Sequence, residues 1–265
     1  MKIDVLPPDI NESFRNFSVV PNEQKIRFGL LAIKNVGSNI VEVIIKERKN
    51  AGKFKSITDF ISRIDSKDLN KRSLESLIKT GAFDNFEERN KLLSNMEEIL
   101  NFNREIRRVK TNGQKSLFHH SATDSTPSFK LKDEKPLAMS QKLLWEKELL
   151  GLYVSSHPLE GFKNILNKKT ISIKDLKTGS FPYTIRVGGV ILSVKKILTK
   201  KGKPMLFVKL EDLTDKIEVI VFSSAIEKNP TAFQENKIVF IMGRLDTWNN
   251  TKKIICEDIE EIIEK

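Results

Sequence analysis

The spacing of apolar residues changes once along this chain, and that change divides it into two kinds of structure. Between Ile26 and about Phe102, apolar side chains recur at steps of three and four residues, which is the period of amphipathic helices. From Tyr183 onward the period is two, which is typical of strands. Residues 111–136 lack either period and are rich in Ser, Thr, Asn, Asp, Gly and Pro. We therefore predict a helical domain and an all-β domain, joined by a flexible linker.

The predicted boundaries follow these changes of pattern. In chain order, we expect an irregular lead-in over 1–25, a helical domain over 26–110, a flexible linker over 111–137, a helical connector over 138–175 and a β domain over 176–265.

Individual residues mark helix ends in the helical domain. Asn70 is a favoured N-cap residue ahead of an apolar repeat, and Gly81 ends that repeat. The next amphipathic pattern runs from Arg89 to Val109. We therefore expect one helix between Asn70 and Gly81, and a single long helix after it.

The β domain has the element order of an OB-fold. Five strand patterns follow Tyr183, and a helical stretch from Ser224 to Gln234 separates the third from the fourth. This is the order of a small five-stranded Greek-key barrel that often binds oligonucleotides. Gly188 and Gly189, in the first strand, fit the sharp bend that such a barrel needs.

Composition excludes several classes of protein. A single cysteine, Cys256, excludes an internal disulfide framework and a multi-cysteine zinc site. No stretch approaches the ~20 apolar residues of a membrane span, and the N-terminus lacks a secretory signal, so we expect a cytoplasmic protein with no membrane partner. Lys and Arg outnumber Asp and Glu by 46 to 35, which favours a polyanionic partner such as nucleic acid.

Two glycine turns in the helical domain are candidates for binding duplex DNA. The first resembles a helix-hairpin-helix motif, with asparagine at a position where that motif usually has glycine, and the second is a weaker copy. Backbone N–H groups at the start of the following helix can hold a phosphate without reading sequence. The alternative is that both are ordinary helix ends. The candidate residues are Lys34, Asn35, Val36, Gly37, Ser38 and Asn39 in the first turn, and Lys79, Thr80 and Gly81 in the second.

A lysine-rich loop between the first two strands is a candidate for binding single strands. Basic side chains beside a strand-borne aromatic can combine phosphate attraction with base stacking. The alternative is a solvated loop with the aromatic side chain, Phe207, in the core. The candidate residues are Arg186, Lys195, Lys196, Lys200, Lys201, Lys203, Phe207 and Arg244.

A short apolar pair in the polar linker is a candidate for binding a protein. The sequence QKSLF at 114–118 resembles the motif with which bacterial replication proteins bind the sliding clamp. In that interpretation Leu117 and Phe118 fill an apolar pocket, Gln114 binds its rim, Ser116 matches the motif, and Lys115 takes the position that accepts any residue.

Enzyme chemistry has little support in the sequence. Nucleotidyl transfer by two metal ions needs convergent carboxylates, whereas the acidic pairs here fall on predicted helix surfaces or at a strand end. The chain has no phosphate-binding GxxxxGK[ST] loop and no GxSxG elbow. We therefore expect no catalytic residues, no metal and no cofactor in this chain.

Nearly the whole chain resembles the C-terminal region of the bacterial replicative DNA polymerase III alpha subunit. The segments that carry the resemblance are LPPDINES at 6–13, IRFGLLAIKNVG at 26–37, GKFKSITDF at 52–60, LNKRSLESLIKTGAFD at 69–84, WEKELLGLYVSSHPL at 145–159 and VGGVILSVKKILTKKGKPMLFVKLEDLTDKIEVIVF at 187–222.

The resemblance implies a tandem helix-hairpin-helix domain on duplex DNA, a clamp-binding segment and an OB domain near single-stranded template. It further implies the sliding clamp and other polymerase III subunits as partners in DNA replication. The polymerase core of that family, with its Mg²⁺, would precede Met1, so we expect a natural fragment, a split gene product or a truncated form that does not polymerise DNA alone. Two other interpretations remain, an RNA-binding OB protein such as an anticodon-binding module, and a nuclease or polymerase.

Overall fold

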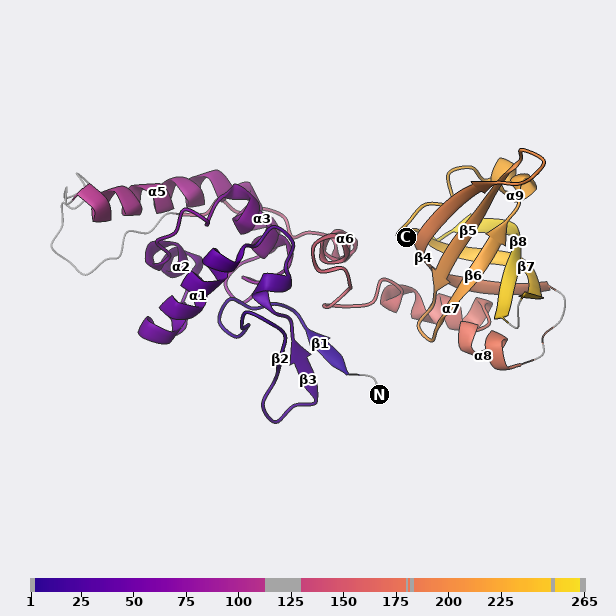
Figure 1. Ribbon diagram of the computed structural model, residues 1–265, viewed down its shortest axis with the longest axis horizontal. Helices are drawn as coiled ribbons and strands as arrows, with labels where there is room; N and C mark the ends of the chain where they lie inside the picture. The colour runs from indigo at the N-terminus through magenta and orange to yellow at the C-terminus, as the bar shows by residue number, and fades with distance from the viewer. Residues whose placement is uncertain (1–2, 113–129, 180, 182–183, 249–250, 263–265) are drawn as a thin grey trace. The chain divides into compact units, whose positions relative to one another are not determined.

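The structure, a computed structural model, divides the chain into two compact units, Met1–Ser155 and Ser156–Lys265 (Figure 1). The first is mainly helical, and the second contains a closed five-stranded barrel, so the predicted fold class is confirmed. No helix within the described ranges is long and apolar enough to cross a membrane. The residues that the structure describes are 3–112, 130–179, 181, 184–248 and 251–262.

The predicted irregular lead-in forms part of the helical unit. Strand β1 (Asp4–Leu6) pairs in parallel with β3 (Lys25–Arg27), and β2 (Ser18–Val19) pairs with β3 in the antiparallel direction. Ile10 is 1% exposed and belongs to the same core as the helices. The prediction of a separate lead-in over 1–25 is therefore corrected, because such short strands carry too few residues to show a period of two.

In the helical unit, one helix begins after the predicted N-cap residue, Asn70, and ends before the predicted glycine, Gly81. The Asn70 side chain accepts hydrogen bonds from the backbone N–H groups of Arg72 and Ser73 and forms a capping box with Ser73. Gly81 follows with a φ of +83°, a conformation that favours glycine. The helices are η1 (Leu30–Ala32), α1 (Ser38–Ala51), α2 (Ile57–Arg63), α3 (Lys71–Lys79), α4 (Arg89–Ser94), α5 (Met96–Asn112) and α6 (Met139–Leu150).

The long helix predicted from Arg89 is broken at Asn95, which separates α4 from α5. The Asn95 side chain is 1% exposed and binds the backbone of Lys132 twice, donating to its carbonyl at 2.9 Å and accepting from its N–H at 2.9 Å. A buried amide that pairs with a distant backbone segment interrupts the helix. The apolar repeat alone does not reveal this break.

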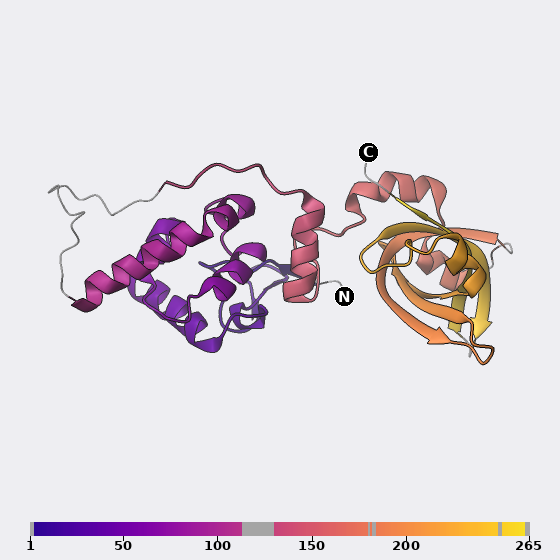
Figure 2. The same cartoon turned by 90° about the horizontal axis from the view of Figure 1, so that it is seen from above.

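Residues 130–138 have no regular secondary structure, yet they lie against the helical unit. Besides the Asn95–Lys132 pair, the Asn90 side chain donates to the Lys135 carbonyl at 2.8 Å. Figure 2 shows this stretch returning past α4 to the start of α6. The described end of the predicted linker is therefore fixed to the helical unit.

The predicted connector over 138–175 is divided between the two units. Its first helix, α6, belongs to the helical unit, where the Leu149 carbonyl accepts a hydrogen bond from the Lys34 backbone N–H at 3.0 Å. Its later elements belong to the barrel unit, where Leu159, Phe162 and Leu166 pack against strand residues. These elements are η2 (Glu160–Phe162), α7 (Lys163–Lys169) and α8 (Ile173–Thr178).

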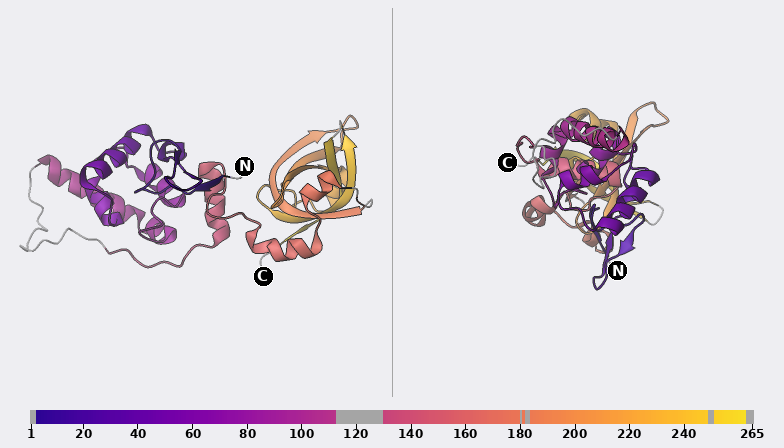
Figure 3. Two further views of the ribbon diagram at one scale, coloured as in Figure 1. Left: turned by 90° about the horizontal axis from the view of Figure 1, so that it is seen from below. Right: turned by 90° about the vertical axis from the view of Figure 1, so that its left-hand side faces the viewer.

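The barrel closes in the strand order β4-β5-β6-β8-β7, with the helix α9 (Ser223–Lys228) between β6 and β7 in sequence (Figure 3). The pair β6 and β8 is parallel, and the other neighbouring pairs are antiparallel. This is the topology expected of the OB-fold. The strands are β4 (Thr184–Leu198), β5 (Pro204–Glu211), β6 (Lys216–Val221), β7 (Ile238–Trp248) and β8 (Thr251–Glu261).

The two glycines in β4 are required for close packing. A Cβ on Gly188 would collide with the Leu166 side chain of α7, and one on Gly189 would lie 2.5 Å from the Glu211 carbonyl oxygen. Two residues later the register of β4 against β5 shifts between Ile191 and Ser193. Glycine therefore lets a helix and a neighbouring backbone approach the strand where it bends.

Candidate nucleic-acid interface

Asn35 turns the chain between η1 and α1. Its backbone φ is +68°, a left-handed conformation that asparagine tolerates better than most residues do. Its side-chain amide donates a hydrogen bond to the Ser76 hydroxyl oxygen at 3.1 Å. The neighbouring Lys34 is held through its backbone bond to Leu149. Distant parts of the same unit therefore fix the first hairpin turn.

The helix that follows this turn, α1, begins with an open N-terminus. Gly37 is its N-cap residue, no side chain caps it, and its first turn contains no acidic residue. A Cβ built on Gly37 would meet no atom within 4 Å, so protein atoms do not block the approach to this turn. The first N–H groups of a helix have no intrahelical acceptor, and together with the helix dipole they suit an anion such as phosphate.

The residues predicted in the first turn are together, but not all face solvent. Lys34, Asn35, Gly37 and Asn39 are exposed, and Ser38 is half-buried. Val36 is 5% exposed and belongs to the hydrophobic core, so it can offer a ligand only its backbone.

The second predicted turn is closed. Thr80 is fully buried, and its hydroxyl donates to the Ser76 and Leu77 carbonyls at 2.8 and 3.1 Å. Gly81 is also buried, and a Cβ there would collide with the Arg89 guanidinium. Thr80 and Gly81 therefore leave a ligand less open space than Gly37 does, and the duplex contacts at these two residues stay predictions.

Lys79, the third residue predicted in that turn, is half-buried and already has partners. Its ammonium pairs with Glu75 at 2.6 Å and lies 5.2 Å from the centre of the Trp145 ring. Both contacts reduce the freedom of this lysine to reach a phosphate. The two turns, although similar in sequence, therefore differ in how much of their backbone and side chains a ligand can reach.

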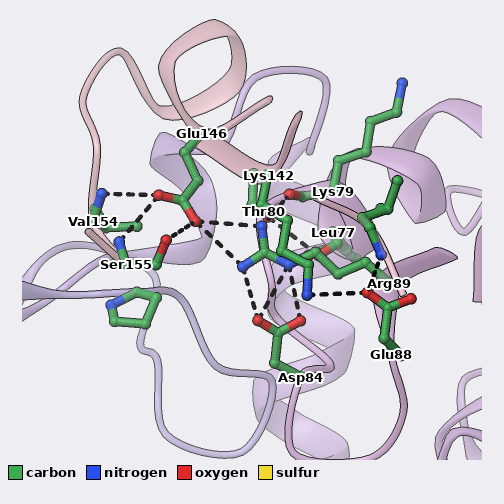
Figure 4. A network of polar contacts seen from close by, with 12 residues as sticks. Leu77, Lys79, Thr80, Asp84, Glu88, Arg89, Lys142, Glu146, Val154 and Ser155 are labelled. Atoms are coloured by element: carbon green, nitrogen blue, oxygen red, sulfur yellow. Dashed lines mark hydrogen bonds and ion pairs between the residues drawn. The ribbon is translucent and has the colours of Figure 1, made fainter. Parts of the chain in front are cut away.

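Arg89 fills the second turn as the centre of a buried ionic network (Figure 4). Its guanidinium donates to the Asp84 carboxylate at 2.8–3.2 Å, to the Lys79 carbonyl at 2.9 Å and to the Glu146 carboxylate at 3.3 Å. Burial lowers the pKa of Arg89, but the hydrogen bond and charge of Asp84, followed by those of Glu146, outweigh burial and raise it. Arg89 is therefore held as a cation inside the protein.

Glu146 extends this network to the end of the helical unit. Its carboxylate is fully buried and accepts hydrogen bonds from the backbone N–H groups of Val154 and Ser155 at 3.0 and 3.1 Å. The Ser155 hydroxyl donates to the same carboxylate at 2.8 Å. The second turn therefore binds α6 and the segment after it, rather than presenting amides to a ligand.

Strand pairing brings three of the predicted single-strand residues into one row on the outside of the barrel. On β4 and β5, Lys195 lies opposite Phe207, and Phe207 in turn lies opposite Ile220 on β6. Ile220 pairs with Ile255 on β8, and Ile255 pairs with Arg244 on β7. Phe207 is half-buried between two core residues, so its side chain takes the outer face and not the barrel interior. Arg244 also pairs with Glu257 at 2.9 Å.

The lysine loop forms a shallow pocket beside this row. Gly202 turns the loop with a φ of +73°, and the Thr199 backbone N–H donates to the Lys203 carbonyl at 2.9 Å. The pocket has a volume of about 320 Å³ and is lined by Thr199, Lys200, Lys201, Lys203, Pro204, Phe222 and Ser223. Three predicted lysines therefore converge near an exposed phenylalanine, Phe222, that the sequence analysis did not single out.

Two predicted basic residues take other positions. Arg186 donates to the Glu260 carboxylate at 2.7 Å and lies 4.3 Å from the centre of the Phe240 ring, in the region where α7 packs on the barrel. Lys196 pairs with Leu206, one residue out of step with the Lys195 row. The Arg186 guanidinium therefore already has partners within the barrel unit, and its single-strand contact stays a prediction.

Two further residues belong to the candidate single-strand face. The Lys253 ammonium lies 5.9 Å from the centre of the Phe207 ring and 5.7 Å from that of Trp248, and it pairs with Glu218. Trp248 is 56% exposed. Strand register places Lys253 between two aromatic side chains, and the sequence analysis singled out neither Lys253 nor Trp248.

The predicted clamp-binding residues, Gln114, Lys115, Ser116, Leu117 and Phe118, lie outside the residues that the structure describes.

Two family models match the chain, one in each module. The model of the helix-hairpin-helix motif matches residues 2–93, and that of the OB-fold nucleic acid binding domain matches residues 185–262. A solved structure titled as the S. pombe Stn1–Ten1 complex shows weaker similarity, with a TM-score of 0.30 and 14% identity over 36% of this chain and 79% of that chain.

Curated relatives match almost the whole chain. The DNA polymerase III subunit alpha of Borreliella burgdorferi is 36% identical over 98% of this chain and 23% of its own length. The subunit of Saccharopolyspora erythraea is 34% identical over 97% of this chain and 22% of its own length. The chain thus spans about a fifth of the length of these relatives. It is a homologue of a C-terminal region of the bacterial DNA polymerase III alpha subunit, with a helix-hairpin-helix module and an OB-fold.

Proposed function

We propose that this chain is the DNA-binding and clamp-binding part of a replicative polymerase in the cytoplasm. The helical unit holds duplex DNA, the barrel holds single-stranded DNA, and residues 114–118 hold the sliding clamp. Polymerisation is the activity named for the relatives, and we propose that it requires more than this chain. The observation that carries the proposal is the open N-terminus of α1 at Gly37, within the region matched by the helix-hairpin-helix model.

Duplex binding at Gly37 needs no base contact and no metal. Exposed amides and a helix dipole attract a backbone phosphate of any sequence. Lys34 is exposed beside the turn and adds positive charge. We therefore propose binding without a cofactor, and a chelator of divalent metals is expected to leave duplex affinity unchanged.

Single-strand binding uses the outer face of the barrel. Phe207 and Trp248 offer ring faces to bases, and Lys253 lies between them. The lysine loop adds Lys200, Lys201 and Lys203 at the edge of the same sheet. Stacking together with a basic edge is how proteins bind single strands without strong sequence preference.

A joint probe tests the two modules together. If both contribute, full-length chain binds a duplex carrying an unpaired overhang more tightly than it binds either the blunt duplex or the free strand. Equal affinity for the overhang probe and the tighter of its two parts would contradict a combined role. A folded RNA of matched length serves as control, and preference for it would favour the RNA-binding alternative.

Clamp binding by Gln114–Phe118 is supported by the anchoring of the chain around it. The described residues before it, in α5, and after it, from Lys130 to α6, belong to the same helical unit. Any clamp bound there is tethered to the unit that we propose holds the duplex. A ring around that duplex would thus be held beside it.

Calorimetry with a purified bacterial clamp tests this part of the proposal. Truncating Leu117 and Phe118 to alanine removes apolar burial of about 1.5–3 kcal/mol for each side chain, so affinity is expected to fall by well over tenfold. Lys115→Ala is the matched control and is expected to bind normally. Equal binding by the double variant, or no binding by wild type, would remove the motif from the account.

A further inference from the structure

A groove in the helical unit lies between residues 14–18 and the second half of α1. Its volume is about 590 Å³, and it is lined by apolar and basic side chains from both segments. We call it the Phe14–Phe17 groove; the lining residues that matter here are Phe14, Arg15, Phe17, Ile45, Lys46 and Lys49. None of the candidate binding residues described above lines this groove.

The two phenylalanines are held in place and still exposed. The Arg48 guanidinium donates to the Ile10 and Ser13 carbonyls, both at 2.9 Å, and lies 5.7 Å from the centre of the Phe14 ring. Phe17 meets the buried Phe28 edge to face, with the ring centres 4.5 Å apart. Phe14 nevertheless keeps 52% of its surface exposed, and Phe17 keeps 48%. The structure therefore presents two preorganised aromatic side chains to solvent.

The rim of the groove is positively charged. Lys46 and Lys49 are exposed, and within the part of the chain that the structure describes neither has an ion-pair partner. Arg15 pairs with Glu42 at 2.6 Å, which neutralises the one acidic side chain of the lining. The remaining polar lining residues include Asn16 and Asn50, whose amides can donate hydrogen bonds. The groove thus combines ring faces with unpaired cations and amide donors.

We propose that the Phe14–Phe17 groove binds an unpaired nucleic-acid strand. Bases stack on Phe14 and Phe17, while Lys46 and Lys49 contact phosphates. Charge complementarity favours a polyanion over an apolar protein surface, because the unpaired charges of the rim are all positive. Lys46 and Lys49 lie 8 to 11 residues from Ser38 along α1, or about 12–17 Å.

The test uses the full chain and separates this groove from the barrel. Lys200, Lys201 and Lys203 are first changed to glutamate, which weakens the proposed barrel contribution. A thymidine oligonucleotide carrying iodouracil is then cross-linked to this background by ultraviolet light, and the modified residues are mapped by mass spectrometry. Cross-links are expected at Phe14 or Phe17. Cross-links confined to other parts of the chain would overturn the proposal.

Affinity for the same oligonucleotide provides the second arm. Phe14→Ala and Phe17→Ala are each expected to weaken binding by roughly 5- to 140-fold, the loss typical of one stacked base. Leu144→Ala, which trims a side chain that is 41% exposed elsewhere in the unit, is the control and is expected to bind normally. Lys46→Gln with Lys49→Gln removes both cations at exposed positions without adding acids near the C-terminus of α1, and is expected to weaken binding and flatten its salt dependence. Unchanged affinity in the lysine variant would overturn the proposal. An acidic apolar peptide that binds the groove without displacing the oligonucleotide would also overturn it, because the oligonucleotide would then be bound elsewhere.

Discussion

Asn35 and Ser76 are 41 residues apart in sequence, and the side-chain amide of the first donates to the hydroxyl oxygen of the second at 3.1 Å. The bond joins the open hairpin turn to α3, the helix that leads into the closed turn. It also holds Asn35 at a φ of +68°. The geometry of the candidate duplex site therefore depends on the packing of the whole helical unit.

Replacing Asn35 separates the roles of its backbone and its side chain. Asn35→Gly keeps access to the left-handed conformation and loses one part-buried hydrogen bond, so unfolding free energy is expected to fall by about 0.5–1.5 kcal/mol. Asn35→Val loses the bond and adds about 1–2 kcal/mol of backbone strain. Denaturant unfolding of the two variants measures the difference. If valine proves as stable as glycine, the strained turn is not what this residue supports.

Removing Glu146 leaves the buried Arg89 with a single carboxylate partner, Asp84. Breaking a buried pair typically costs about 3–5 kcal/mol, and Asp84 keeps the expected loss for Glu146→Ala near the lower end. The exposed pair Lys71–Glu97, 3.8 Å apart, is the control, and Glu97→Ala is expected to cost no more than about 1 kcal/mol. Denaturant unfolding measures both, and equal losses would contradict a central role for the network.

Cys256 links stability to alkaline pH. Burial, followed by the charge of Asp258, raises the pKa of its thiol from 9.0 to about 12. Between these values the unfolded chain loses the thiol proton while the folded chain keeps it, so unfolding free energy falls as pH rises. Relative to Cys256→Ala, the wild type is expected to lose about 1.4 kcal/mol per pH unit within this window. Parallel stability curves for the two proteins from pH 9 to pH 11 would contradict the buried-thiol assignment.

The outer face of the barrel is expected to lose single-strand binding when its rings are trimmed. Phe207→Ala and Trp248→Ala are each expected to lower affinity for a thymidine oligonucleotide by about 1–3 kcal/mol. Ile165→Ala, on α7 and 43% exposed, is the control and is expected to have no effect. Fluorescence anisotropy measures all three. Loss in the control alone, or in none, would show that the strand does not bind this face.

Local patterns predicted much of this fold, and long-range interactions explain what they missed. The cap at Asn70, the stop at Gly81 and the five strands follow from residues close together in sequence. The break at Asn95 depends on Lys132, and the closure of the second turn depends on Arg89 meeting Glu146, 57 residues away. A glycine turn looks the same in sequence whether its amides are open, as at Gly37, or covered, as at Gly81.

In the barrel, too, the features that the sequence did not predict depend on pairing between distant strands. The sequence left two positions open for Phe207, the core and the outer face, and the choice between them needed the pairing of the strands. Lys253 and Trp248 joined the candidate site only through that pairing. The lysine loop was visible from composition, because its residues are neighbours in the chain.

The most direct test of the account is duplex affinity as a function of salt for wild type, Gly37→Val and Ala51→Val. Gly37 has an ordinary φ of −81° and free space for a side chain, so the valine variant is expected to fold and to block only the approach of a phosphate. Ala51→Val adds similar bulk at the exposed other end of α1. We predict that Gly37→Val weakens binding and flattens the salt slope by about 0.9 for each phosphate that the variant no longer neutralises, while Ala51→Val matches wild type. Identical affinities and slopes for all three proteins would contradict duplex binding at the first hairpin turn.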